Sequence, residues 1–260
     1  MQPVRLADCS VIVLLFPLLV GLAAGSFLNV CIHRLPRGES VVFPPSRCPH
    51  CGQRLAARDL VPLFSYLWLK GRCRYCGSGI SPRYPLVEAL TGVLFAVLYM
   101  RFGLNLLLFK YLFLTSVLIV LSFIDLEHYL IPDRIIIFAL AGGVIINLFT
   151  RDLTFLSVLL GLAAPAAFLL LLAVASRGGM GGGDIKLAAV TGLFLGWPLG
   201  LLAVFLGCLL GGLVGAVLLL SRIKGRKDAI PFGPFLACGA ITTILGGQQI
   251  LNWYLGNFRI

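Results

Sequence analysis

The sequence predicts an all-α integral membrane protein with about eight transmembrane helices and a small cytoplasmic four-cysteine module, of the zinc-binding type, between the first two helices. Of 260 residues, 59% are hydrophobic and only 12% are charged, and the mean hydropathy is +1.01. These values are typical of chains that span a bilayer and exclude an ordinary soluble domain. The apolar residues also gather into long runs, interrupted by one polar segment that contains four closely spaced cysteines.

Eight apolar stretches are candidate spans, because a helix needs about 20 apolar residues to cross the hydrocarbon core. They lie at residues 9–33, 85–101, 105–125, 132–149, 154–176, 184–197, 199–221 and 231–252. The sixth stretch is short for a full crossing. The first could pass for a signal peptide, but its apolar run continues to Val30 and no convincing cleavage site follows, so we expect a retained helix.

Lysine and arginine residues set the predicted orientation. If segment 34–84 is cytoplasmic, eight crossings place sixteen basic residues inside and four outside. The inside set is Arg34, Arg37, Arg47, Arg54, Arg58, Lys70, Arg72, Arg74, Arg83, Arg134, Arg177, Lys186, Arg222, Lys224, Arg226 and Lys227; the outside set is Arg5, Arg101, Arg151 and Arg259, and Lys110 falls within the third span. The positive-inside rule therefore predicts that both termini lie outside. This bias accounts for the net charge of +11, which consequently does not indicate nucleic-acid binding.

Four of the eight cysteines form two pairs in the polar segment, Cys48-x-x-Cys51 and Cys73-x-x-Cys76, separated by 21 residues. Each pair is followed by a glycine, and this spacing is typical of a four-thiolate zinc site. A disulfide framework is the alternative, although a reducing cytoplasm disfavours it. The segment has too little apolar content for a core of its own, so metal binding would supply much of its folding free energy. The other cysteines, which we expect to behave as small hydrophobic residues, are Cys9, Cys31, Cys208 and Cys238.

Two aspartates stand at the inner ends of apolar helices, Asp125 at the end of the third span and Asp184 at the start of the sixth. A carboxylate at the edge of a bilayer is costly to desolvate, so two at similar depth suggest a shared task. Paired carboxylates can hold one proton between them and activate a water molecule. The structural alternatives are a helix N-cap for Asp184 and a polar residue ending a span for Asp125.

The segment before Asp184 holds five glycines around Met180. Glycine density of this kind disfavours a helix and allows close approach of another backbone, so Gly181 and Gly183 are candidate contacts for an extended peptide substrate. Two further carboxylates, Asp133 and Glu88, occupy first-turn positions of spans, where helix dipoles favour negative charge, and a structural role is expected for Asp133. The sequence leaves open whether Glu88 binds a ligand.

In chain order these features resemble the bacterial type IV prepilin peptidases, which are membrane aspartic proteases of the Gly-x-Gly-Asp type. The resemblance covers nearly the whole chain. It rests on Gly25-Ser-Phe-Leu-Asn-Val, Arg34-Leu-Pro, both cysteine pairs, Ser81-Pro-Arg-Tyr-Pro-Leu-Val-Glu, Asp125 with Ile131-Pro-Asp, Gly181-Gly-Gly-Asp-Ile-Lys-Leu and Ile230-Pro-Phe-Gly-Pro-Phe.

The resemblance implies a bifunctional enzyme of the bacterial inner membrane. Such an enzyme removes the leader of prepilins and pseudopilins at the cytoplasmic face, with Asp125 and Asp184 as the catalytic pair, and then methylates the new N-terminus with S-adenosylmethionine. It also implies a division into a first helix (1–33), a methyltransferase-associated cysteine module (34–84) and a peptidase domain (85–260).

No glycine-rich strand–helix nucleotide motif is present, so the sequence assigns no residue to S-adenosylmethionine. The alternative function is a peptidase alone, whose cysteine module serves structure or substrate docking. A transporter would place acidic residues at the membrane midplane, and a zinc adaptor would leave both aspartates without a role. The sequence does not indicate an oligomeric state.

Overall fold

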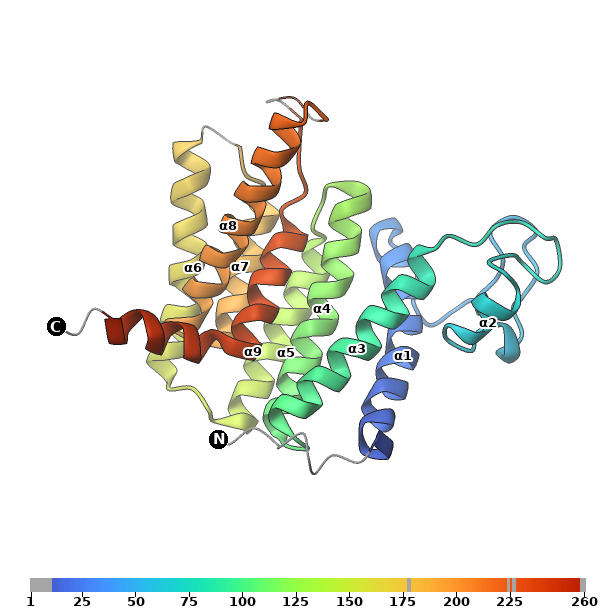
Figure 1. Cartoon of the computed structure of the whole chain (residues 1–260), viewed down its shortest axis with the longest axis horizontal. Helices are drawn as coiled ribbons and strands as arrows, with labels where there is room; N and C mark the ends of the chain where they lie inside the picture. The colour runs from blue at the N-terminus through green and yellow to red at the C-terminus, as the bar shows by residue number, and fades with distance from the viewer. Residues whose placement is uncertain (1–10, 177–178, 224, 226–227, 258–260) are drawn as a thin grey trace. The chain divides into compact units, whose positions relative to one another are not determined.

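The computed structural model describes residues 11–176, 179–223, 225 and 228–257, and these residues form helices without a named strand (Figure 1). The α-helices are α1 (Val11–Arg34), α2 (Phe64–Trp68), α3 (Arg83–Phe102), α4 (Leu106–His128), α5 (Asp133–Thr150), α6 (Phe155–Ala175), α7 (Gly182–Leu195), α8 (Leu199–Leu220) and α9 (Gly233–Asn257). Two 3-10 turns, η2 (Leu35–Arg37) and η3 (Ala57–Asp59), lie between α1 and α2. The predicted all-α fold is confirmed.

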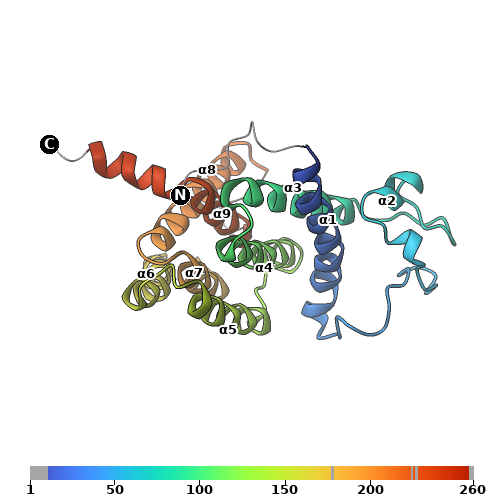
Figure 2. The same ribbon diagram turned by 90° about the horizontal axis from the view of Figure 1, so that it is seen from below.

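Seven of these helices, α1, α3, α4, α5, α6, α8 and α9, are long and apolar enough to cross a membrane, judged over the described residues. The chain is therefore a multi-pass membrane protein. The remaining expected span is α7, whose 14 residues would extend only about 21 Å at 1.5 Å per residue, less than the hydrocarbon core of about 30 Å. It packs against α5, α6, α8 and α9, and Figure 2 shows it from below beside α5 and α6. Most of its side chains are buried.

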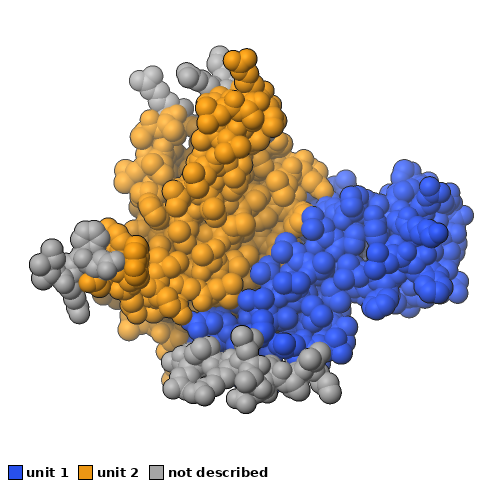
Figure 3. All heavy atoms as spheres, in the orientation of Figure 1, with its two compact units in different colours: residues 1–108 blue, residues 109–260 orange. Residues whose placement is uncertain are grey.

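The chain divides into two compact units, residues 1–108 and 109–260 (Figure 3). In the first unit, α1 and α3 lie side by side because glycines let their backbones approach. A Cβ added at Gly21 would come 2.7 Å from the Cα of Gly92, and one added at Gly25 would come 2.7 Å from the Cα of Glu88. Near the end of α1, Asn29 Nδ2 donates a 3.0 Å hydrogen bond to the carbonyl of Tyr84.

The second unit packs α6, α7 and α8 through backbone contact. A Cβ added at Gly192 of α7 would overlap the carbonyl of Gly161 in α6. At the opposite end of α7 from Asp184, the fully buried Lys110 donates to Asp152 Oδ2 and to Asn147 Oδ1, both at 2.8 Å. Asn147 in turn donates to the carbonyl of Leu193 in α7. These bonds satisfy a cation that would be costly to leave unpaired inside a membrane.

Several residues used to predict the orientation lie outside the described residues, and so does one cysteine. They are Arg5, Cys9, Arg177, Lys224, Arg226, Lys227 and Arg259. The predicted placement of both termini stays a prediction.

Candidate active site and cysteine cluster

Asp125 lies in the last turn of α4 and is held by the start of α9. Only 6% of its surface is exposed, and its Oδ2 accepts a 2.8 Å hydrogen bond from the amide of Gly233, the first residue of α9. Glycine is required here, because a Cβ at position 233 would come 2.9 Å from the same oxygen. The carboxylate therefore sits against a helix N-terminus, where free amides and the helix dipole favour negative charge.

Asp184 lies in the first turn of α7, with 9% of its surface exposed. The N-cap residue is Gly181, and Asp184 Oδ2 reaches back to accept a 3.2 Å hydrogen bond from the Gly181 amide. Asp184 is therefore the third residue of the helix rather than its N-cap, so the alternative role as an N-cap is wrong. Its carboxylate nonetheless satisfies an amide that the helix leaves free, as the acidic residue of a capping box does.

The two carboxylates lie near each other in the second unit. The charge of Asp125 acts on Asp184, so the two groups are near enough to interact electrostatically. Each is held through a single oxygen, and the Oδ1 atom of each has no hydrogen-bond partner among the described residues. Each buried carboxyl group thus keeps one oxygen that forms no hydrogen bond with the described residues. Together the two groups can bind a water molecule and exchange protons with it.

The glycines before Asp184 have packing roles that sequence reasoning missed. A Cβ at Gly183 would come 2.8 Å from the Cβ of Ile131, so glycine lets α7 pack against the segment that joins α4 to α5. A Cβ at Gly181 would come 3.2 Å from Asp184 Oδ2. Their expected contact with a substrate backbone stays a prediction.

Asp133 begins α5, and its Oδ1 forms an exposed 2.6 Å ion pair with Lys186 of α7. This contact ties α5 to the first turns of α7. Asp133 thus has an ion-pair partner in addition to its position in the first turn of α5, where the sequence predicts a structural role.

The four paired cysteines come together in the first unit. The Sγ atoms of Cys48, Cys51, Cys73 and Cys76 all lie within 4.8 Å of one another, and those of Cys48 and Cys76 are 3.8 Å apart. A tetrahedral zinc ion with Zn–S bonds of about 2.3 Å requires S–S separations of about 3.8 Å. The four are free thiols, so the alternative of a disulfide framework does not describe this cluster.

The two pairs have the same local structure. The amides of Gly52 and Gly77 each donate a 2.9 Å hydrogen bond to the carbonyl of the first cysteine of their pair, and both glycines have a positive φ, 69° and 71°. The turn that each pair needs is thus one that glycine adopts without strain.

Ionisation of the thiols also suits a metal. Burial of the Cys48 thiol opposes its ionisation. Hydrogen bonds from the amides of Cys51 and His50 outweigh this effect, and the pKa of Cys48 is lowered to about 6. For Cys51 the Gln53 amide favours the thiolate, yet burial and the neighbouring thiols of Cys48 and Cys76 raise the pKa to about 11. Thiolates this close repel one another, so a bound cation is needed to hold all four ionised.

Two carboxylates fix this module within the first unit. Asp59 Oδ1 accepts from Arg74 Nε at 2.6 Å, and its Oδ2 accepts from the hydroxyl of Tyr75 at 3.0 Å, so the second cysteine turn is held against η3. The Arg74 guanidinium accordingly lowers the pKa of Asp59. Glu88 of α3 accepts a 2.9 Å hydrogen bond from the amide of Leu63, the residue before α2. This bond gives Glu88 a structural role, whereas the sequence left open whether Glu88 binds a ligand.

Comparison with known proteins agrees with this architecture. Residues 19–102 match the bacterial peptidase A24 N-terminal domain, and residues 112–216 match the type IV leader peptidase family. The chain is 39% identical to the prepilin leader peptidase/N-methyltransferase of Bacillus subtilis (strain 168), over 90% of this chain and 95% of that protein.

Proteins with the same name in Aeromonas hydrophila and Stutzerimonas stutzeri are 38% and 36% identical. The first alignment covers 95% of this chain and 94% of that protein, and the second covers all of both. No solved structure gave a significant match. The chain belongs to the type IV leader peptidase family.

Proposed function

We propose that this protein cleaves the leader from prepilins and pseudopilins and methylates the new N-terminus, with Asp125 and Asp184 as the catalytic pair of the cleavage reaction. The names of its relatives support both activities. The observation that carries the peptidase proposal is the pair of buried, interacting carboxylates, each held by one backbone amide at a helix N-terminus.

In the proposed mechanism one aspartate is ionised and the other is protonated, because two close carboxylates cannot both stay ionised. The ionised aspartate takes a proton from water, and the water oxygen attacks the scissile carbonyl carbon while the protonated aspartate donates its proton to the carbonyl oxygen. The tetrahedral intermediate then collapses and the C–N bond breaks. The first aspartate gives the proton that it took from water to the leaving amine nitrogen, and the second aspartate takes a proton back from a hydroxyl of the intermediate. The amides of Gly233 and Gly181 stabilise charge on both partners, so they do not decide which one carries the proton.

The distribution of charge supports a site at the cytoplasmic face of the bacterial inner membrane. With the short α7 counted as the eighth crossing, it also supports both termini in the periplasm. Arg134 lies near the start of α5 and Lys186 near the start of α7, and the cysteine module is basic as well. By the positive-inside rule, these basic residues favour the cytoplasmic side. An extended substrate would run beside Gly181 and Gly183.

Methylation requires a methyl donor, which we propose is S-adenosylmethionine. We assign this activity to the module at residues 34–84, between the first helix (1–33) and the peptidase domain (85–260). Cys48, Cys51, Cys73 and Cys76 would hold a zinc ion that cross-links the two cysteine turns and takes no part in a chemical step. A peptidase whose module serves only structure or docking is the alternative.

Replacing either aspartate with asparagine tests the proposal. Asparagine keeps the size and most hydrogen bonds of aspartate but cannot exchange the carboxyl proton, so Asp125→Asn and Asp184→Asn should each lower cleavage by at least about 10²-fold. Asp133→Asn is the matched control and should leave cleavage nearly unchanged. In the assay, purified protein is incubated with a prepilin and S-adenosylmethionine, and the molecular mass of the product is measured by mass spectrometry. More than a few per cent of native cleavage in either variant refutes the two-aspartate mechanism.

A further inference from the structure

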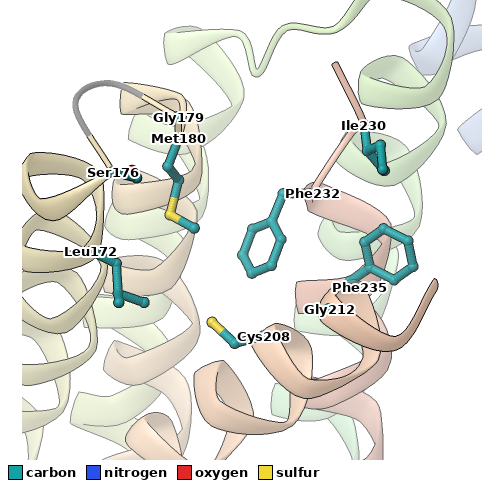
Figure 4. Close-up of a pocket in the computed structure, with 10 residues that line it drawn as sticks. Leu172, Ser176, Gly179, Met180, Cys208, Gly212, Ile230, Phe232 and Phe235 are labelled. Atoms are coloured by element: carbon teal, nitrogen blue, oxygen red, sulfur yellow. The ribbon is translucent and has the colours of Figure 1, made fainter. Parts of the chain in front are cut away.

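Large apolar side chains outside the long helices are arranged differently in the two units. In the second unit, Met180 and Phe232 point into a cavity of about 360 Å³ (Figure 4). In the cysteine module of the first unit, the apolar side chains of the short helix α2 face outward. Trp68 is 83% exposed, and Phe64 and Leu67 are each 71% exposed. Three such side chains together on a surface mark a place where a partner or a membrane binds.

These three residues form one face of α2. Phe64, Leu67 and Trp68 are spaced at i, i+3 and i+4, so their side chains lie on the same side of the helix. Tyr66, between them in sequence, is half-buried, and a Cβ added at Gly71 would come 3.0 Å from its hydroxyl. One side of α2 therefore packs within the module, and the described residues leave the other side uncovered.

A hydrogen bond sets the level of α2 beside a membrane span. The amide of Leu63, the residue before α2, donates to Glu88 Oε2 at 2.9 Å. Glu88 lies five residues after Arg83, the first residue of α3, which is roughly 7.5 Å along a helix long enough to cross the bilayer. Side chains of a helix lean toward its N-terminus, so α2 begins beside the first two turns of α3, as Figures 1 and 2 show. This is the level at which headgroups meet acyl chains.

The surroundings of this face are basic. Arg58 precedes α2 and Lys70 follows it, and both are exposed. Segment 34–84 holds nine lysine and arginine residues but only two acidic residues, of which Asp59 is paired with Arg74. The anionic lipids of a cytoplasmic leaflet attract such a surface, whereas a second copy of the same basic surface would be repelled.

We propose that the apolar face of α2 docks into the cytoplasmic surface of the bilayer and anchors the cysteine module to anionic phospholipids. Phe64 and Leu67 enter the upper part of the acyl-chain region, and the indole of Trp68 lies at headgroup level, where tryptophan is enriched in membrane proteins. Arg58 and Lys70 face the lipid phosphates. The proposal uses the cytoplasmic orientation of the module, and it is independent of the two-aspartate mechanism.

Trp68 itself can report docking, because the chain has only three tryptophans. In a Trp197→Phe, Trp253→Phe protein, all tryptophan fluorescence comes from Trp68. The full chain is reconstituted into nanodiscs of phosphatidylcholine, or of equal parts phosphatidylcholine and phosphatidylglycerol. Trp68 is then quenched either by lipids with brominated acyl chains or by acrylamide from water. Docking predicts quenching by the brominated lipid and protection from acrylamide, and both effects should be greater when phosphatidylglycerol is present.

Variants of the exposed side chains in this background separate the two contributions. Phe64→Gln with Leu67→Gln should lower the ratio of docked to undocked module by about tenfold or more. Arg58→Gln with Lys70→Gln should remove the gain from phosphatidylglycerol, which is about fivefold for each basic residue near the surface.

Leu104→Gln with Leu106→Gln is the matched control, because these apolar side chains are also exposed but lie at the other end of α3. It should behave as the parent protein does. The thermal unfolding midpoint of each variant in detergent checks that it is folded.

Three results would overturn the proposal. Strong acrylamide quenching without quenching by brominated lipid would place the face in water. Protection from both quenchers would mean that protein, either a second copy or another segment, covers it. Lipid quenching that is the same with and without phosphatidylglycerol would exclude anionic lipid as the occupant. Cleavage is not measured here, so failure of the proposed peptidase function would leave these results unchanged.

Discussion

The amide of Gly233 is the contact to test first, because it holds Asp125 and joins segments 108 residues apart. In Gly233→Ala the new Cβ would lie 2.9 Å from Asp125 Oδ2, closer than real Cβ contacts come. The carboxylate is the end of a side chain and can rotate, so the protein should fold. The rotation breaks the 2.8 Å hydrogen bond, and Asp125 loses both its donor and its fixed position.

The size of the effect follows from that bond. A hydrogen bond to a charged group contributes about 1.5–3 kcal/mol. At 1.36 kcal/mol for each factor of ten, its loss should lower kcat about 10- to 150-fold. The equivalent change at Gly181 should cost less, because a Cβ there would come 3.2 Å from Asp184 Oδ2 and needs only a small shift. The expected order of activity is therefore wild type, Gly181→Ala, Gly233→Ala.

The assay is single-turnover cleavage of a prepilin by purified protein in detergent, with the thermal unfolding midpoint measured in parallel. Gly256→Ala is the control, since an added Cβ there meets nothing within 4 Å. Methylation of a pre-cleaved pilin should persist in Gly233→Ala if the two reactions use separate sites. A folded Gly233→Ala protein with wild-type kcat would show that the amide contact does not position Asp125 for catalysis.

Local patterns account for the parts of the structure that the sequence predicted. The apolar runs gave the membrane helices to within a few residues, since about 20 apolar residues in sequence specify a span without reference to the rest of the fold. The spacing of the cysteines likewise predicted that Cys48, Cys51, Cys73 and Cys76 converge, because each pair folds through its own glycine turn.

Contacts between distant segments were beyond reach of the same reasoning. Nothing near Asp125 in sequence indicates that Gly233 donates to it, and the motif Ile230-Pro-Phe-Gly-Pro-Phe carried only a part of the family resemblance. The ion pair of Asp133 with Lys186 also joins two helices, so periodicity within either one does not reveal it. The short length of α7 was visible in the sequence, but its burial depends on glycine contacts with α6 that only the fold displays.

Two further predictions concern the cysteine cluster of the first unit and the ion pair between Lys110 and Asp152 in the second. Serine at Cys48, Cys51, Cys73 or Cys76 should release zinc and impair methylation before cleavage, because three thiolates hold the ion less well than four; metal analysis of wild-type protein that finds no zinc would exclude the assignment. Asp152→Asn should lower the free energy of unfolding by about 3–5 kcal/mol, since it leaves the fully buried charge of Lys110 without its carboxylate partner. The double variant Lys110→Met, Asp152→Asn removes both charges and should recover most of that loss in thermal unfolding. If the single variant is as stable as the wild type, or the double variant is no better than the single one, then the 2.8 Å pair does not hold the α5–α6 connection to α4.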